Sequence, residues 1–451
     1  MAYSVAELID ERPLSGFQIR TISLCGMVLL LDGFDTQCIG FLAPAIAAEL
    51  GLAMKAFGPV FSAALIGLMI GALASGPIAD RLGRKVVVIG SAITFAFFTV
   101  LTARAGTLQE FVIFRFLTGL GLGGAMPNVV ALTSEYTPRR LQPIFVSGLF
   151  AGMPLGALIA SLLSAKMLPL WGWRSVFYLG GLLPLVIAFI LIRLLPESVR
   201  FLAATGADPR KIAGIMKRIA PDLDGVEIRM PPPDKESRGM PVKYLFTEGR
   251  ASGTILLWIP FFMNLLLLYF FVNWLPGLLT TAGLPISAGV TAAGIFSLGG
   301  VTGSLLQGRL MRRYGPFATI FGEFSLSVLL IFLMASASSF AVTMTTTLIL
   351  GITIQGGQAG LNALSASYYP TAVRSTGVGW ALGVGRVGSI VGPMLAGVLL
   401  SLDWTAPQIF MAGTVPALIA AFAVLASQLI GGGTNAYGAP VDLRKVTVSH
   451  L

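Results

Sequence analysis

The sequence predicts an all-α membrane protein with twelve transmembrane helices, arranged as two pseudo-symmetric halves of six helices each. Three observations lead to this fold class. Charged residues make up 11% of the chain and hydrophobic residues 55%, whereas soluble proteins carry roughly 25% charged residues. Apolar stretches of about 20 residues, the length needed to span hydrocarbon, recur along most of the chain. The third observation is an internal repeat that relates the two halves.

The apolar stretches predict where the chain crosses the membrane. We expect helices at 20–44, 57–79, 86–104, 109–133, 143–167, 174–195, 252–280, 287–308, 317–336, 340–366, 377–401 and 407–430. Of the 30 lysines and arginines, four lie in connections on one side and two lie inside spans, which leaves 24 on the side of the termini. Both termini are therefore expected in the cytoplasm. No cleavable signal peptide is expected, because the first 20 residues are polar.

The chain repeats itself at a constant offset of 232 residues. The matching positions include pairs of identical residues, such as Gly67 and Gly299, Gly71 and Gly303, Gly119 and Gly351, and Pro44 and Pro276. A chance match would not keep one offset over more than 100 residues. We therefore expect a six-helix half at 1–195, a cytoplasmic connecting segment with short amphipathic helices at 196–250, a second six-helix half at 251–430 and a cytoplasmic tail at 431–451.

The residues that build most metal and enzyme sites are scarce in this chain. Cys25 and Cys38, the only cysteines, lie in the first span, and His450, the only histidine, lies in the tail. We therefore expect no metal site and no cofactor. The sequence contains no nucleophile–base pair and no G-x-x-x-x-G-K-S/T loop, so we expect neither an enzyme nor an ATP-driven transporter. The basic residues follow the loops, so the net charge of +10 does not indicate nucleic acid.

The connection between the second and third spans carries a recognisable motif. It reads Gly76-Pro-Ile-Ala-Asp80-Arg81-Leu-Gly83-Arg84-Lys85, in which Gly83 permits a tight turn. The motif resembles the G-x-x-x-D-R-x-G-R-K/R signature of the major facilitator superfamily, which implies two six-helix halves around a midplane site. The resemblance also implies that Gly76, Asp80, Arg81, Gly83 and Arg84 form a gating loop that latches the outward-open state. The second half carries Arg312 at the position of the acid, so a latch there is expected to be weaker or built from different charges.

Three further stretches narrow the resemblance. They are Asp32-Gly-Phe-Asp35, the run from Arg115 to Asn128 that closes with Glu135-Tyr136, and the run from Tyr369 to Pro393. Together they resemble the aromatic acid:proton symporters, bacterial uptake systems for benzoates and hydroxybenzoates. The resemblance implies proton-coupled uptake of an aromatic carboxylate across the bacterial inner membrane by alternating access, by a monomer. An exporter or antiporter, uptake of another organic anion, and a membrane sensor on the same scaffold stay open as alternatives.

Paired acids in the first span are the expected proton-coupling site. Asp32 and Asp35 are three residues apart, which places them on one face of a helix, and an acid inside a membrane marks a functional site by default. The resemblance adds Glu135, which ends the fourth span. We expect Asp35 to carry the proton and Asp32 to be coupled to it. A structural charge network with Arg115 remains an alternative for the acid pair, and a solvated loop acid remains one for Glu135.

The expected substrate site is built on arginine, because its guanidinium donates two parallel hydrogen bonds to a carboxylate. Arg386 is the preferred ligand, although it can also serve helix packing. Arg115 either binds substrate or, as we favour, pairs with an acid of the first span. The expected aromatic and amide neighbours of the ring are Asn128, Tyr269, Asn273, Trp274, Gln355, Gln358 and Asn362. Polar residues within spans can also do no more than bridge helices. Glu323, close to an expected helix end, is a weaker candidate that could reach the headgroups.

Overall fold

The computed structural model describes residues 3–206, 209–220, 228–229, 242–247, 249–337, 339–369 and 373–431. Within these residues, 11 helices are long and apolar enough to cross a membrane. One of them, at Ile144–Leu194, contains 51 residues, about 75 Å of helix, which is enough for two crossings of a core about 30 Å thick. The chain therefore crosses twelve times, as the sequence predicts.

The first half contains five long helices. They are α2 (Gly16–Leu50), α3 (Phe57–Leu82), α4 (Arg84–Thr102), α5 (Leu108–Tyr136) and α6 (Gln142–Leu194), with a short 3₁₀ turn, η1 (Met54–Ala56), before α3. Capping boxes begin two of them, with Ser15 and Gln18 at α2 and Thr107 and Glu110 at α5. The helix α6 comprises the fifth and sixth spans, because the chain reverses at Gly172, whose φ of 71° is not helical.

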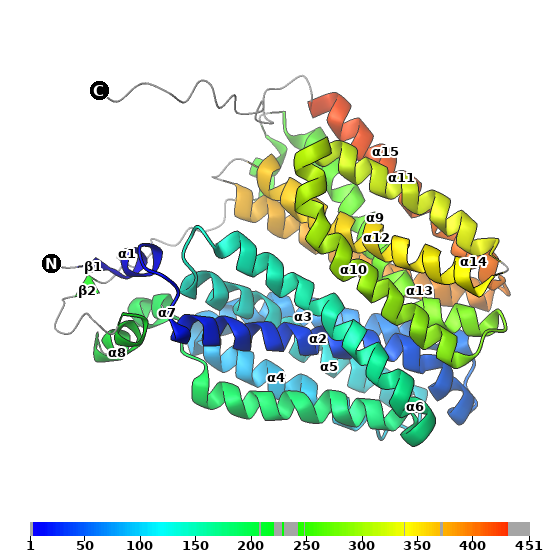
Figure 1. Cartoon of the computed structure of the whole chain (residues 1–451), viewed down its shortest axis with the longest axis horizontal. Helices are drawn as coiled ribbons and strands as arrows, with labels where there is room; N and C mark the ends of the chain where they lie inside the picture. Colours follow the sequence, from blue (N-terminus) through cyan, green and yellow to red (C-terminus); the bar gives the residue numbers. More distant parts are fainter. Residues whose placement is uncertain are drawn as a thin grey trace.

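The second half repeats this arrangement. Its helices are α9 (Ala251–Thr281), α10 (Ile286–Tyr314), α11 (Pro316–Ala335), α12 (Phe340–Tyr368), α13 (Arg374–Ser401), α14 (Ala406–Ala412) and α15 (Thr414–Gly431). The last two together form the twelfth span. Figure 1 shows the two halves as two groups of helices that lie side by side.

Glycines let the same pair of helices pack closely in each half. A Cβ added to Gly119 of α5 would lie 1.9 Å from the carbonyl oxygen of Ala64 in α3. A Cβ added to Gly351 of α12, the residue 232 positions later, would lie 2.1 Å from the carbonyl oxygen of Phe296 in α10. Any side chain would force these helices apart. The internal repeat therefore preserves the helix contacts that only glycine permits.

Short elements gather at one end of the bundle (Figure 1). They are α1 (Val5–Asp10), α7 (Val199–Ala204), α8 (Pro209–Ile219), a 3₁₀ turn η2 (Val242–Phe246), and the parallel pair β1 (Tyr3–Ser4) and β2 (Ile228–Arg229). The helices α7 and α8 lie in the segment for which short amphipathic helices are expected. Neither α1 nor the strand pair is expected from the sequence. Most of 221–241 and all of the expected tail at 431–451 except Gly431, the last residue of α15, lie outside the described residues.

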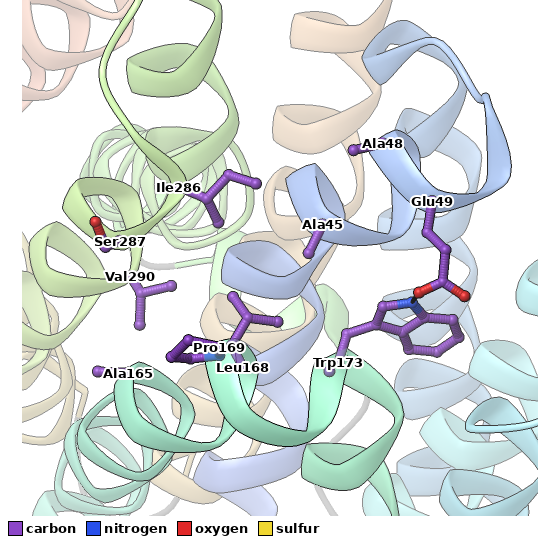
Figure 2. Close-up of a pocket in the computed structure, with 11 residues that line it drawn as sticks. Ala45, Ala48, Glu49, Ala165, Leu168, Pro169, Trp173, Ile286, Ser287 and Val290 are labelled. Carbon is purple, nitrogen blue, oxygen red and sulfur yellow. Dashed lines mark hydrogen bonds between the residues drawn. The ribbon is translucent and has the colours of Figure 1, made fainter.

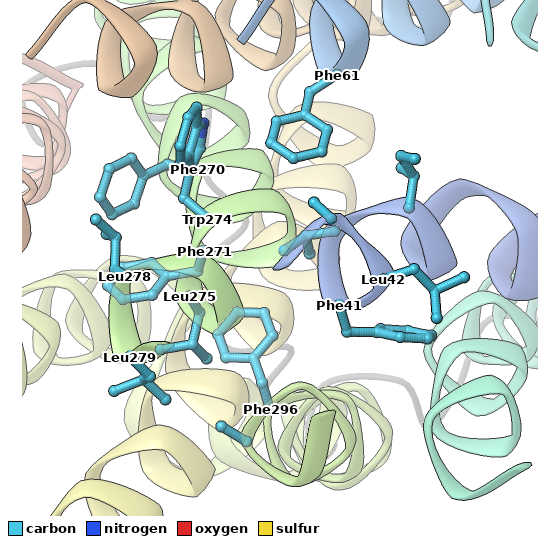
Figure 3. Close-up of a cluster of buried hydrophobic side chains, with 14 of the residues drawn as sticks. Phe41, Leu42, Phe61, Phe270, Phe271, Trp274, Leu275, Leu278, Leu279 and Phe296 are labelled. Atoms are coloured by element: carbon cyan, nitrogen blue, oxygen red, sulfur yellow. The ribbon is translucent and has the colours of Figure 1, made fainter. Parts of the chain in front are cut away.

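The two ends of the bundle differ in how the halves meet. We call the end that carries Arg20, Arg84 and Arg193 the basic end, and the opposite one the far end. At the far end one apolar cluster contains residues of both halves, among them Phe41, Phe61, Trp274, Leu278 and Phe296 (Figure 3). At the basic end each half has a separate core. The halves are thus joined at the far end and apart at the basic end, which is the arrangement of a transporter open towards the basic end.

Candidate functional site

A cavity of about 140 Å³ lies between the two halves. Five of its lining residues are among the predicted site residues: Tyr269 of α9, Gln355, Gln358 and Asn362 of α12, and Arg386 of α13. The first half contributes Thr36, Gln37, Met126, Phe150, Met153 and Pro154. An apolar cavity of roughly 150 Å³ accepts one benzene ring. The cavity therefore has the size for one ring and a cation in its wall.

Among the described residues, the hydrogen-bond partners of the Arg386 side chain are uncharged. Its Nη1 donates to the hydroxyl of Tyr269 at 3.2 Å, and its Nη2 lies 3.5 Å from the sulfur of Met126. None of the ion pairs among the described residues includes Arg386. A half-buried guanidinium without an anion is a poorly compensated charge. Arg386 is therefore the group in the cavity wall best suited to bind a carboxylate.

Arg115 and Asp35 form an ion pair inside the first half, and the side chains of both are 0% exposed. The hydroxyl of Thr99 donates to the other oxygen of Asp35 at 2.6 Å. The guanidinium of Arg115 also lies over the ring of Phe177, with 5.8 Å between its carbon and the ring centre. Neither member of the pair lines the cavity. The structure thus places Arg115 as the counter-ion of Asp35 and away from the ring-sized cavity.

Asp32 interacts both with a residue of the cavity wall and with the Arg115–Asp35 ion pair. Its Oδ1 accepts from the hydroxyl of Thr36 at 2.9 Å, and Thr36 lines the cavity. Its Oδ2 is buried and has no hydrogen-bond partner. Asp32 interacts electrostatically with Arg386 and with Asp35. The acid is thus connected both to the cation of the cavity and to the buried pair.

Three predicted ring neighbours do not line the cavity. The amide of Asn128 donates to the carbonyl of Gly124 at 2.9 Å, one turn earlier in the same helix. The amide of Asn273 likewise donates to the carbonyl of Tyr269 at 2.8 Å. The indole of Trp274 donates to the carbonyl of Pro393 at 2.8 Å and is fully buried. In this conformation the three side chains donate to backbone carbonyls, and only that of Trp274 links two helices, α9 and α13.

The predicted gating loop packs against two glutamates at the basic end. Arg84 pairs with Glu135, whose other oxygen accepts from the hydroxyl of Ser198 at 2.7 Å. Because the Glu135 side chain is only 7% exposed, the alternative of a solvated loop acid is wrong. Glu197 accepts from the backbone N–H of Lys85 at 3.0 Å.

Gly83 and Asp80 show how the loop is held. Gly83 has a φ of 96°, a backbone conformation that favours glycine, and a Cβ there would lie 2.3 Å from the carboxylate of Glu197, which would have to shift. Asp80 is exposed, and none of the ion pairs among the described residues includes it. The expected latch residue is thus unlatched in a structure open towards the basic end.

A second and larger cavity, of about 560 Å³, lies at the far end (Figure 2). Its lining is apolar apart from Glu49, Ser287 and the indole of Trp173. Glu49 accepts from that indole at 2.8 Å and pairs with Arg174. With an acid in the wall and its arginine already paired, this cavity is poorly suited to a carboxylate. The central cavity is the better site despite its smaller volume.

Two kinds of functional residue escaped the sequence analysis. Thr36 and Gln37 directly follow Asp35, and Thr36 lies one turn after Asp32, so helical spacing was a usable signal for them. Met126 and Phe150 are apolar residues of apolar helices, and no signal in the sequence separates them from lipid-facing neighbours. Thr99 is equally inconspicuous, since it contacts Asp35 from another helix.

Comparison with known proteins agrees with the geometry. The sequence matches the Major Facilitator Superfamily over residues 25–381. It is 39% identical over 431 residues to the 4-hydroxybenzoate transporter PcaK of Pseudomonas aeruginosa, covering 94% of this chain and 96% of the relative. It is 39% identical to a gallate transporter of Pseudomonas putida, with 94% of each chain covered, and 36% identical to a benzoate transport protein of Acinetobacter baylyi, with 92% of this chain and 91% of the relative covered.

Solved structures of lower sequence identity share the fold. A bacterial homolog of the human lysosomal transporter Spinster, in an inward-facing and unoccupied conformation, has a TM-score of 0.72 at 16% identity and covers 94% of this chain and 99% of its own. A D-xylose-proton symporter has a TM-score of 0.69 at 17% identity, covering 91% of this chain and 97% of its own. The family match, the curated relatives and the cavity agree: the chain belongs to the major facilitator superfamily and, within it, to the family of aromatic acid transporters.

Proposed function

We propose that this protein takes up an aromatic carboxylate together with protons across the bacterial inner membrane, by alternating access and as a monomer. In this proposal the basic end and both termini face the cytoplasm, because lysine and arginine concentrate on the cytoplasmic side of membrane proteins. The observation that carries the proposal is Arg386, a cation without a carboxylate partner in the wall of a ring-sized cavity between the halves. The relatives named for 4-hydroxybenzoate, gallate and benzoate support the same substrate class.

The cavity offers complementary groups for each part of such a substrate. The guanidinium of Arg386 pairs with the carboxylate and loses little in doing so, because its present partners are a hydroxyl and a thioether. Phe150, Met153 and Leu268 provide apolar surface for the ring. The amides of Gln355 and Gln358 already make hydrogen bonds within the protein. Asn362, whose oxygen accepts from Gln358, offers its N–H groups to a hydroxyl group on the ring. Binding thus requires both the anion and the ring.

Proton coupling is proposed for Asp35, with Asp32 coupled to it. A proton that arrives on Asp35 neutralises that carboxylate and leaves Arg115 as a buried cation without its counter-ion. This is a costly state that a rearrangement of α2 against α5 relieves. Asp32 interacts electrostatically with both Asp35 and Arg386. The charge of the acid pair therefore influences the cation that binds substrate. Glu135 is proposed to couple this change to the gating loop through Arg84.

Uptake into proteoliposomes tests this proposal. Labelled 4-hydroxybenzoate is supplied with and without an inward proton gradient to wild type and to Asp35→Asn. We expect the gradient to drive accumulation by wild type and a protonophore to abolish it. Asp35→Asn is expected to keep exchange and to lose accumulation, because asparagine carries no transferable proton. Normal accumulation by the variant would show that Asp35 is structural, and no movement of any benzoate would reject the substrate class.

A further inference from the structure

Glu323 is the one carboxylate inside the spans of the second half, because Asp403, the other acid of 251–430, lies in the connection before α14. The alternative that Glu323 reaches the headgroups is wrong, because the residue is only 8% exposed. Gln307 donates from Nε2 to Glu323 Oε2 at 3.2 Å. None of the ion pairs among the described residues includes Glu323. A lone ionised carboxylate is costly in such a place, so the site favours the neutral acid, which can donate a hydrogen bond.

The helices around Glu323 bring no compensating charge. The helix α11 packs against α10, α12, α14 and α15. By sequence, α14 and α15 carry no titratable residue, and α12 carries only Tyr368, at its end. The charges of α10, on Arg309, Arg312 and Arg313, are exposed at the basic end. The carboxyl group therefore faces amides and apolar groups.

An acceptor without a donor lies next to this acid. Asn264 Oδ1 is buried and has no hydrogen-bond partner. A Cβ added to Gly357 would lie 3.6 Å from Glu323 Oε2 and 4.0 Å from Asn264 Oδ1. Both oxygens thus border the gap that the missing side chain of Gly357 leaves. A neutral Glu323 can supply a hydrogen towards Asn264 Oδ1 across this gap, directly or through one water molecule.

From Asn264 a chain of amides leads to the substrate cavity. Asn264 Nδ2 donates to Gln358 Oε1 at 2.9 Å, and Gln358 Nε2 donates to Asn362 Oδ1 at 3.1 Å. Both Gln358 and Asn362 line the cavity. Each amide accepts on one side and donates on the other, so the whole chain has a direction. In the observed direction, Asn362 keeps its N–H groups for the cavity.

We propose that Glu323 is a second proton-binding site, and that its proton sets the direction of the hydrogen-bond chain that ends at the substrate cavity. With the proton bound, Glu323 donates towards Asn264 and Asn362 presents N–H groups to an anion. With the proton lost, the carboxylate accepts from Asn264, the amides reverse, and Asn362 presents an oxygen that repels the anion. Proton and anion then bind with positive coupling, which is reciprocal. The inference rests on the proposed function only for the identity of the anion.

Infrared spectroscopy and equilibrium binding on the purified full-length protein test this site. We expect the C=O stretch of a neutral carboxyl group in wild type that is absent in Glu323→Gln. Gly357→Ala places a methyl group at ordinary contact distance in the gap, so the band should remain but shift to higher frequency as its hydrogen bond is lost. Gly322→Ala, next to the acid in sequence with open space around it, is the matched control and should leave the band unchanged.

Binding of 4-hydroxybenzoate then tests the link to the cavity. Wild-type affinity should fall as the pH rises through the titration of Glu323, by at most about tenfold per pH unit for one linked proton. Glu323→Gln cannot lose a proton and should keep the low-pH affinity, and Gly357→Ala should lose most of the dependence. An infrared spectrum in which Glu323→Gln removes no band would overturn the proton site. A pH dependence identical in wild type and both variants would overturn the link.

The two proposals can fail separately. If wild type does not bind 4-hydroxybenzoate, the substrate assignment fails, and the infrared band still tests Glu323. In that case an unshifted band in Gly357→Ala would overturn the hydrogen bond to Asn264. If Asp35→Asn accumulates substrate normally while the band behaves as expected, Glu323 remains a proton site and the first-half mechanism is rejected.

Discussion

The two halves share a fold and divide the chemistry. In the first half Arg115 neutralises Asp35 in a buried ion pair, with Asp32 close by in the same helix. In the second half Arg386 and Glu323 each lack an oppositely charged partner among the described residues. At the offset of 232, Asp32 corresponds to Asn264 and Arg386 to Pro154. The repeat therefore keeps the contacts that define the fold and varies the charged residues.

Breaking the buried pair is the strongest test of this comparison. Arg115→Leu leaves Asp35 as an uncompensated buried charge, which should lower the free energy of unfolding by about 3–5 kcal/mol. The double variant Arg115→Leu/Asp35→Leu should recover most of that loss, because it buries no charge. Thermal unfolding of the detergent-solubilised protein measures both. A double variant as unstable as the single one would show that the two residues do not stabilise the fold as a pair.

The glycine contacts test a feature that the two halves share, so substitutions there should destabilise both halves alike. Gly119→Ala and Gly351→Ala each place a methyl group about 2 Å from a carbonyl oxygen of the neighbouring helix. Overpacking of this kind costs about 1–3 kcal/mol, so both variants should lower the unfolding temperature by similar amounts. Gly90→Ala, with open space around it in α4, serves as the control. A loss in one half alone would contradict equal packing.

Hydrophobicity made the spans predictable, because twelve apolar stretches leave few alternatives in a bilayer. The predicted break between 167 and 174 contains Gly172, where the chain reverses. The short helix α1 could not be predicted from its six residues, since it is stabilised by packing, with Leu8 and Ile9 in the core at the basic end. Local sequence therefore identifies elements that the membrane requires and misses those that only tertiary contacts support.

The site was predictable in kind and less so in position. Charges inside spans drew attention to Asp35, Arg115 and Arg386, because such residues are rare in hydrocarbon. The sequence could not decide whether Arg115 faces substrate or acid, since that depends on the rotation of α5 about its axis. Asn128 and Trp274 were expected at the ring because of their chemistry, whereas the structure directs their donors to backbone carbonyls. The type of a side chain thus indicates which role it can have, and the rotation of its helix decides whether it reaches the site.

Equilibrium binding of labelled 4-hydroxybenzoate to the purified protein tests the central claim, that Arg386 holds the substrate carboxylate. A hydrogen bond to a charged group contributes about 1.5–3 kcal/mol, so Arg386→Gln should weaken binding by roughly 10- to 150-fold. The affinity of Arg386→Lys should lie between those of wild type and Arg386→Gln. Arg174→Gln, which removes an arginine at the far end, is the matched control and should bind as wild type does. If Arg386→Gln binds with unchanged affinity while the protein remains folded, Arg386 is not the carboxylate ligand and the proposed site is wrong.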